Sequence, residues 1–152
     1  MIGTTSAAGF ETAIAKYPDM ELIGTDYNET DIAKAQAQTA AVIQREKELK
    51  GIFGTNTHSA AGAGLAVNNA GLQEEIVVMG FDADAEAHDN LKTGAIDLVL
   101  AQKPYEMGLL SGLLGLAHLK GVPDLPNKIT TGYVVITKEN FEDPEFAKWF
   151  YK

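Results

Sequence analysis

Two short runs of consecutive apolar residues constrain the fold of this chain more than any other feature. Ile76-Val77-Val78-Met79 and Leu98-Val99-Leu100-Ala101 contain no polar residue, and each is flanked by charged, amide or glycine residues. A strand that is apolar on both faces needs cover on both faces, which parallel sheets obtain from flanking helices. The two runs therefore predict an α/β fold with a doubly wound parallel sheet.

The rest of the chain alternates apolar, β-branched runs with longer segments of helical spacing, as such a fold requires. We expect strands at residues 20–25, 51–56, 75–82, 96–102 and 132–137, and helices at residues 6–17, 30–47, 57–70, 84–93 and 104–120. Only residues 1–4 stand before Thr5, which adjoins the first expected helix, and they are too few for a central strand of about 5 residues or more. The opening strand is therefore expected to be incomplete, as in a chain cut from something longer.

The last expected helix differs from the others in its apolar surface. Its leucines and Met107 cover almost the whole circumference, whereas the helix at 30–47 carries its apolar residues along one stripe. Pro104 suits the first turn of a helix. Such a helix needs apolar neighbours on several sides, and where these are missing we expect self-association of the chain through the 104–120 helix.

The composition narrows the class of partner. The 152 residues fit one ordinary domain, and 21 acidic against 12 basic residues, with a single arginine, give a net charge of -9. Binding to nucleic acid depends on contacts from clustered lysines and arginines to phosphates, so we expect no nucleic-acid partner. No apolar run approaches the roughly 20 residues that span a bilayer, and no signal peptide is visible. We therefore expect no membrane insertion.

Polar side chains stand where three of the expected strands end. These are Asn56, Asp82 and Gln102. Ligands of doubly wound sheets bind beyond the carboxyl ends of the strands, and a carboxylate with two amides suits the hydroxyl groups of a sugar or polyol. The alternative is that these residues only end strands and cap helices, which Asn and Asp often do.

Other motifs do not indicate catalysis or a cofactor. Gly62-Ala63-Gly64 lies inside an expected helix, so it favours helix packing over a phosphate site. The acidic run that begins at Asp82 and contains Asp84 and Glu86 fits capping of a helix better than a metal site. No histidine has a Ser or Asp partner in a recognisable motif. We therefore expect no enzyme, no metal and no cofactor.

Several segments together match a known family. They are Gly51-Ile52-Phe53-Gly54-Thr55-Asn56, Val77-Val78-Met79-Gly80-Phe81-Asp82, Leu91-Lys92-Thr93-Gly94, Ala101-Gln102-Lys103-Pro104-Tyr105-Glu106-Met107-Gly108 and Thr131-Gly132-Tyr133-Val134-Val135-Ile136-Thr137-Lys138-Glu139-Asn140. In this combination they closely resemble the type I periplasmic sugar-binding proteins of ABC transporters, the group of the ribose-binding protein.

The resemblance implies a protein of two Rossmann-like α/β lobes that closes on a sugar and presents its closed form to an ABC permease, outside the cytoplasm. It implies that residues 1–102 are the second lobe, with its opening strand incomplete. Residues 103–152 would hold the hinge crossing, the Leu-rich helix and the returning C-terminal strand. Most of the first lobe would be absent from this chain.

The resemblance also suggests which residues bind the sugar. Asn56, Asp82 and Gln102 match positions where family members hydrogen-bond the ligand, and Thr30 falls near where some members place an aromatic ring. One departure concerns Gly9-Phe10, which in the family usually follows a short turn with a sugar-binding Arg. That Arg has no counterpart here.

Two other functions remain open from the sequence. The same two-lobed core forms the effector-binding part of repressors that resemble the lactose repressor, although no helix-turn-helix is visible here. An enzyme on a flavodoxin-like sheet would need a phosphate loop or a catalytic group. Neither is evident in the sequence.

Overall fold

Four short strands of the described residues form the sheet at the centre of the fold. The structure, a computed structural model, describes residues 2–151. Strands β1 (Gly51–Phe53), β2 (Val77–Phe81), β3 (Leu98–Ala101) and β4 (Val134–Thr137) lie in the order β1-β2-β3-β4. The first three are parallel, and β4 runs antiparallel to β3. The predicted parallel sheet is confirmed, with an antiparallel strand added at one edge.

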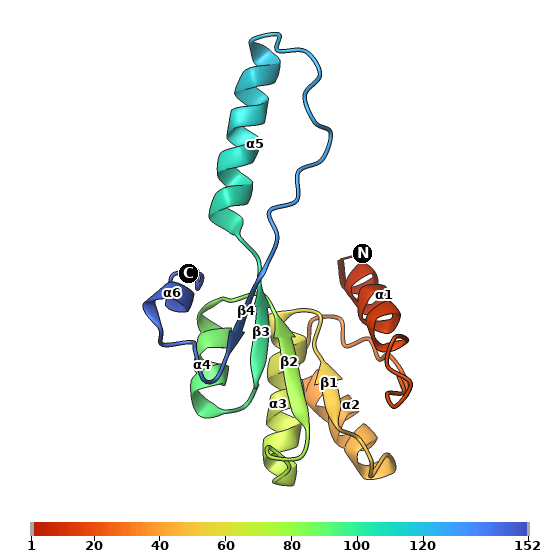
Figure 1. The fold of residues 1–152 in the computed structure, drawn as a ribbon. Coiled ribbons are helices and arrows are strands. Elements are labelled where there is room, and N and C mark those ends of the chain that lie inside the picture. The colour runs from red at the N-terminus through yellow and green to blue at the C-terminus, as the bar shows by residue number, and fades with distance from the viewer. Residues whose placement is uncertain (1, 152) are drawn as a thin grey trace.

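The described residues also form six helices beside the sheet. They are α1 (Ile2–Ile14), α2 (Ile32–Arg45), α3 (Thr57–Ala70), α4 (Ala85–Thr93), α5 (Pro104–Leu119) and α6 (Pro144–Ala147). Helix α3 packs on β2 and lies between α2 and α4, so one layer of three helices covers one face of the sheet (Figure 1). The largest fully buried side chains lie in and around this layer and on the strands it covers: Leu91, Ile96, Ile136, Val67, Val78 and Val99.

The opposite face of the sheet is less covered than the sequence predicts. Phe10 of α1 contacts the ring of Phe53 at 5.0 Å between centroids, which covers part of β1. Val77 on β2 and Val135 on β4 are 46% and 40% exposed. The continuous apolar runs thus form strands as expected, but only one of their faces is fully buried in this chain.

The expected strand at 20–25 is wrong, because this segment forms no regular structure. In a doubly wound sheet of this type, the strand after the first helix pairs with the strand before that helix. Among the described residues α1 already begins at Ile2, earlier than the expected residue 6, so no such neighbour is present. Met20 and Ile23 remain largely exposed.

Glycines allow the helical layer to approach its neighbours closely. A Cβ on Gly62 of α3 would come within 2.5 Å of the Ala35 side chain on α2, and one on Gly64 would collide with the carbonyl oxygen of Ala95. The helix-packing interpretation of Gly62-Ala63-Gly64 is therefore confirmed. A third glycine, Gly54 after β1, leaves room for the backbone of Ala60 at the start of α3.

A carboxylate joins three strands at the amino ends of β2 and β3. Asp97 accepts hydrogen bonds from the backbone N–H of Val78 and from Nζ of Lys138, both at 2.8 Å. Its backbone carbonyl also accepts from the N–H of Lys138 at 3.0 Å. The hydrogen bond and the charge of Asp97 raise the pKa of Lys138 above its usual value.

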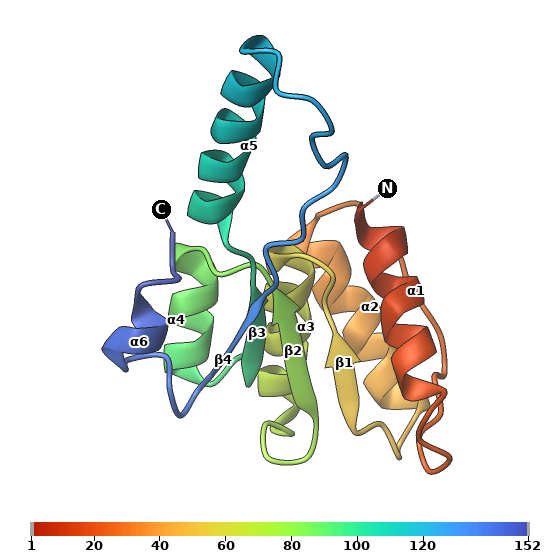
Figure 2. The ribbon, with the colours of Figure 1, turned by 45° about the horizontal axis from the view of Figure 1, so that its top comes forward.

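Helix α5 leaves the lobe altogether. Figures 1 and 2 show it projecting beyond the end of the sheet, with residues 121–133 returning beside it to β4. None of its residues is buried, and Leu113, Leu116 and Leu119 are at least half exposed. The predicted helix over 104–120 is confirmed, and none of the described residues buries its apolar circumference.

The glycine packing predicts a stability difference between two substitutions. Gly64→Ala should lower the free energy of unfolding by about 1–3 kcal/mol, because the added methyl group forces α3 away from Ala95. The matched control is Gly115→Ala on α5, where a Cβ meets nothing within 4 Å and the free energy should rise by about 0.5–1 kcal/mol. Urea unfolding followed by circular dichroism measures both. Equal effects of the two substitutions would contradict this packing.

Candidate functional site

The carboxyl ends of the parallel strands form one rim of the sheet, and two predicted site residues meet there. Asp82 follows β2 and Gln102 follows β3, and Nε2 of Gln102 donates to Oδ1 of Asp82 at 2.5 Å. Both side chains are half-buried. The pair therefore presents the remaining carboxylate lone pairs and the amide oxygen of Gln102 at the edge of the sheet.

The backbone of Asp82 adopts a conformation that few residues of its type take. Its φ is 76°, in the left-handed region. The N–H of Asp82 donates to the carbonyl of Leu100 at 3.0 Å, which extends the β2–β3 ladder by one more bond. A left-handed non-glycine residue persists only where its surroundings hold it, and such residues gather at binding sites.

Asn56 caps a helix at the same rim. Its Oδ1 accepts from the backbone N–H of Ser59 at 2.9 Å, at the start of α3. The capping alternative therefore accounts for the oxygen of Asn56. Its Nδ2 group remains as a donor at the rim.

A hydrogen bond that the sequence did not predict joins this cap to the loop before α2. The hydroxyl of Ser59 donates to Oδ1 of Asn28 at 2.8 Å, and Nδ2 of Asn28 donates to the carbonyl of Asp31 at 3.0 Å. Asn28 and Ser59 thus fix the loop beside Asn56. A long-range pair of two small polar residues leaves no periodic signal in a sequence.

Thr30 lies in this loop and not in α2, contrary to the expected helix start at residue 30. The helix begins at Ile32 and is capped by Asp31, whose Oδ1 accepts from the N–H of Lys34 at 2.7 Å. Thr30 is exposed and has a left-handed φ of 64°. The structure therefore brings Asp82 and Gln102 into contact and leaves Thr30 at the margin of the rim.

The acidic run after β2 has the capping role that the sequence favoured. Oδ1 of Asp84 accepts from the N–H of Ala87 at 2.9 Å, so Asp84 caps α4, as predicted. Among the described residues no group of three acidic or histidine side chains is placed to hold a metal ion.

None of the helices in the described part of the chain is long and apolar enough to span a membrane.

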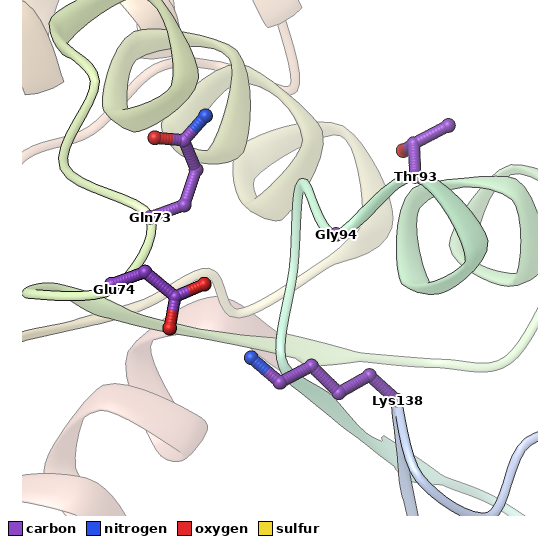
Figure 3. A pocket seen from close by; sticks show the side chains of 5 residues that line it. All are labelled: Gln73, Glu74, Thr93, Gly94 and Lys138. Atoms are coloured by element: carbon purple, nitrogen blue, oxygen red, sulfur yellow. The ribbon is translucent and has the colours of Figure 1, made fainter.

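Two pockets in the described part of the chain are lined by residues other than the strand-end pair. One of about 470 Å³ is lined by Gln73, Glu74, Thr93, Gly94 and Lys138 at the opposite end of the sheet, where the Lys138 side chain extends toward Glu74 (Figure 3). Another is lined by Ala85, His88, Asp89, Phe150 and Tyr151. Neither pocket is lined by Asp82 or Gln102.

The sheet has a polar rim at its strand ends, and the helical arm α5 departs just after β3. In doubly wound proteins, ligands bind at such a rim. The chain belongs to the family described as "Periplasmic binding protein domain", which it matches over residues 4–122. The resemblance inferred from the sequence is thereby confirmed.

The similar proteins are named for the binding of a sugar or another solute. A D-allose-binding periplasmic protein of Escherichia coli (strain K12) is 29% identical over 106 residues. An ABC transporter solute-binding protein from Agrobacterium vitis, solved with bound α-D-tagatopyranose, is 39% identical and superposes over 99% of this chain with a TM-score of 0.89. A second A. vitis solute-binding protein, solved with D-fucose, is 32% identical over 95% of this chain with a TM-score of 0.80.

The chain corresponds to part of each of these relatives. It spans 34% of the length of the E. coli protein and 50% of each A. vitis chain. The chain thus spans between about a third and a half of the length of these relatives.

Proposed function

We propose that this chain is the second-lobe part of the sugar- or polyol-binding component of an ABC transporter. Residues 1–102 form the lobe, and residues 103–152 form the hinge crossing, the arm and the returning strand. The observation that carries the proposal is the hydrogen-bonded pair of Asp82 and Gln102 at the strand-end rim. The named ligands of the similar proteins, D-allose, α-D-tagatopyranose and D-fucose, are all hydroxyl-rich.

The chemistry of the rim suits vicinal hydroxyl groups. An ionised carboxylate accepts about four hydrogen bonds, of which Gln102 supplies one, so Asp82 can accept from ligand hydroxyls. Charge-assisted bonds of this kind are roughly twice as strong as neutral ones. The Nδ2 group of Asn56 donates to a ligand oxygen, and Thr30 offers a hydroxyl at the margin.

The proposed mechanism is a binding equilibrium without catalysis. A sugar held between this rim and an opposing lobe shifts the protein from open to closed by the difference in its affinity for the two forms. An ABC permease then reads the closed form, with the parent protein acting in the periplasm or another extracytoplasmic compartment. The repressor alternative gains no support, because the similar proteins reported above are named for transport or for periplasmic binding.

The isolated chain should bind sugars poorly, because it lacks a wall opposite the rim. Calorimetric titration with a panel of pentoses, hexoses and polyols should reveal no binding of millimolar strength or tighter. Asp82→Ala is the control. Tighter binding that disappears in Asp82→Ala would show a working site completed by another copy of the chain, and would contradict the need for an opposing lobe.

A chimera tests the function itself. The first lobe of the α-D-tagatopyranose-bound A. vitis protein, joined to this chain, should restore binding of a monosaccharide in the same panel. Asp82→Ala in the chimera should weaken binding roughly tenfold or more, since a hydrogen bond to a charged group contributes about 1.5–3 kcal/mol. A folded chimera that binds no sugar, or one that is indifferent to Asp82→Ala, would contradict the proposal.

The exposed arm leads to an expectation about assembly. Leu113, Leu116 and Leu119 form an apolar surface that water disfavours, so we propose that isolated chains self-associate through the 104–120 helix or exchange it. Sedimentation velocity should show a dimer or larger species that Leu113→Lys with Leu116→Lys converts to monomer. A clean monomer of the unsubstituted chain at high concentration would overturn this proposal.

A further inference from the structure

The C-terminal segment, residues 148–151, contacts the chain directly beside both members of the rim pair. The backbone N–H of Tyr151 donates to the carbonyl of Ala83 at 3.0 Å, one residue after Asp82. The ammonium group of Lys103, one residue after Gln102, lies 4.9 Å from the centroid of the Trp149 ring. A segment distant in sequence thus joins the two strand ends that carry the proposed ligand-binding groups.

Aromatic packing anchors this segment on α4. The His88 ring lies between two rings of the C-terminal region, at 5.4 Å from Phe141 and 4.9 Å from Phe150, both edge to face. Such pairs contribute about 0.5–1.5 kcal/mol each beyond the area they bury. Trp149, Phe150 and Tyr151 also pack against the buried core, so the segment is part of the lobe and not a loose tail.

We propose that Tyr151 and Trp149 are positioning residues of the sugar site, with Tyr151 orienting the carboxylate of Asp82 and Trp149 fixing the start of the hinge crossing at Lys103. The inference rests on the proposed function for its consequence in sugar binding. The contacts that it invokes belong to the chain alone and are tested without a ligand.

The surroundings of the Tyr151 hydroxyl agree with this role. Burial, the charge of Asp82 and a hydrogen bond to Asp82 raise the pKa of Tyr151 to about 12, with a smaller contribution from the charge of Asp84. His88 and Asp89 line the adjoining pocket. Gln102 donates to the carboxylate of Asp82 at 2.5 Å, and the Tyr151 hydroxyl interacts with the same carboxylate. Because an ionised carboxylate accepts about four hydrogen bonds, it can still accept from ligand hydroxyls.

The raised pKa has a definite consequence for stability. The folded chain holds the Tyr151 proton more tightly than the unfolded chain, so this contribution is fully present below the ordinary tyrosine pKa near 10 and is lost as the pH rises toward about 12. Between those values the unsubstituted chain should lose stability relative to Tyr151→Phe, in which the group does not titrate.

The test uses nuclear magnetic resonance of the whole chain and three variants. Tyr151→Phe removes only the hydroxyl, Asp82→Asn removes the charge that faces it, and Tyr133→Phe is the matched control, since Tyr133 is 69% exposed and lies on the returning segment. At neutral pH, Tyr151→Phe should shift the side-chain amide resonances of Gln102, and Tyr133→Phe should leave them unchanged. In an alkaline titration, the Tyr151 signal is identified by its absence from Tyr151→Phe. The pKa read from this signal should fall in Asp82→Asn from about 12 toward 10.

The outcomes separate this inference from the proposed function. Two results would overturn the positioning role even if the chimera binds sugar. One is that the Gln102 resonances are unchanged in Tyr151→Phe, and the other is that the pKa of Tyr151 is the same in Asp82→Asn as in the unsubstituted chain. In the chimera, Tyr151→Phe should weaken sugar binding about 3–10-fold, which corresponds to the loss of one hydrogen bond, with no effect of Tyr133→Phe. Failure of the unsubstituted chimera to bind would refute the proposed function and leave the Gln102 and Tyr151 measurements to decide the inference.

Discussion

The parallel pairing of β1, β2 and β3 is the constraint on which the rest of this structure depends. The carboxyl ends of parallel strands all lie on the same side of the sheet. Pairing Phe53 with Met79 and Phe81 with Leu100 therefore places the residues that follow at one rim. The pairing in turn requires α3 to lie close against the sheet, which Gly54 and Gly64 permit. Asp97 joins β2, β3 and β4 at the opposite end of the sheet, where β2 and β3 begin.

The parts of the fold that the sequence could predict are those specified by local pattern. Apolar runs predicted β2 and β3, and a one-sided apolar stripe predicted α2. The capping role of Asp84 and the packing role of Gly62 and Gly64 also follow from nearby residues. The rim could be predicted as well, because topology alone brings the ends of parallel strands together.

The parts that the sequence could not predict depend on partners distant along the chain. A strand at residues 20–25 needs a neighbouring strand, and without one among the described residues its apolar pattern does not suffice. The left-handed Thr30 lies in a loop held by the cap at Asp31 and by the Asn28–Ser59 bond, which joins residues far apart in the sequence. The contact of Tyr151 with Ala83 joins residues far apart, and no local signal marks it.

The central claim is that the strand-end rim is a half-site for a sugar. Chemical-shift mapping of the isotopically labelled chain, at hexose and pentose concentrations far above the millimolar range, tests it most directly because weak contacts remain visible. The account predicts small shifts that depend on concentration and cluster around Asn56, Asp82 and Gln102. Shifts confined to the pocket around Glu74 and Lys138, or none at any sugar concentration, would contradict it.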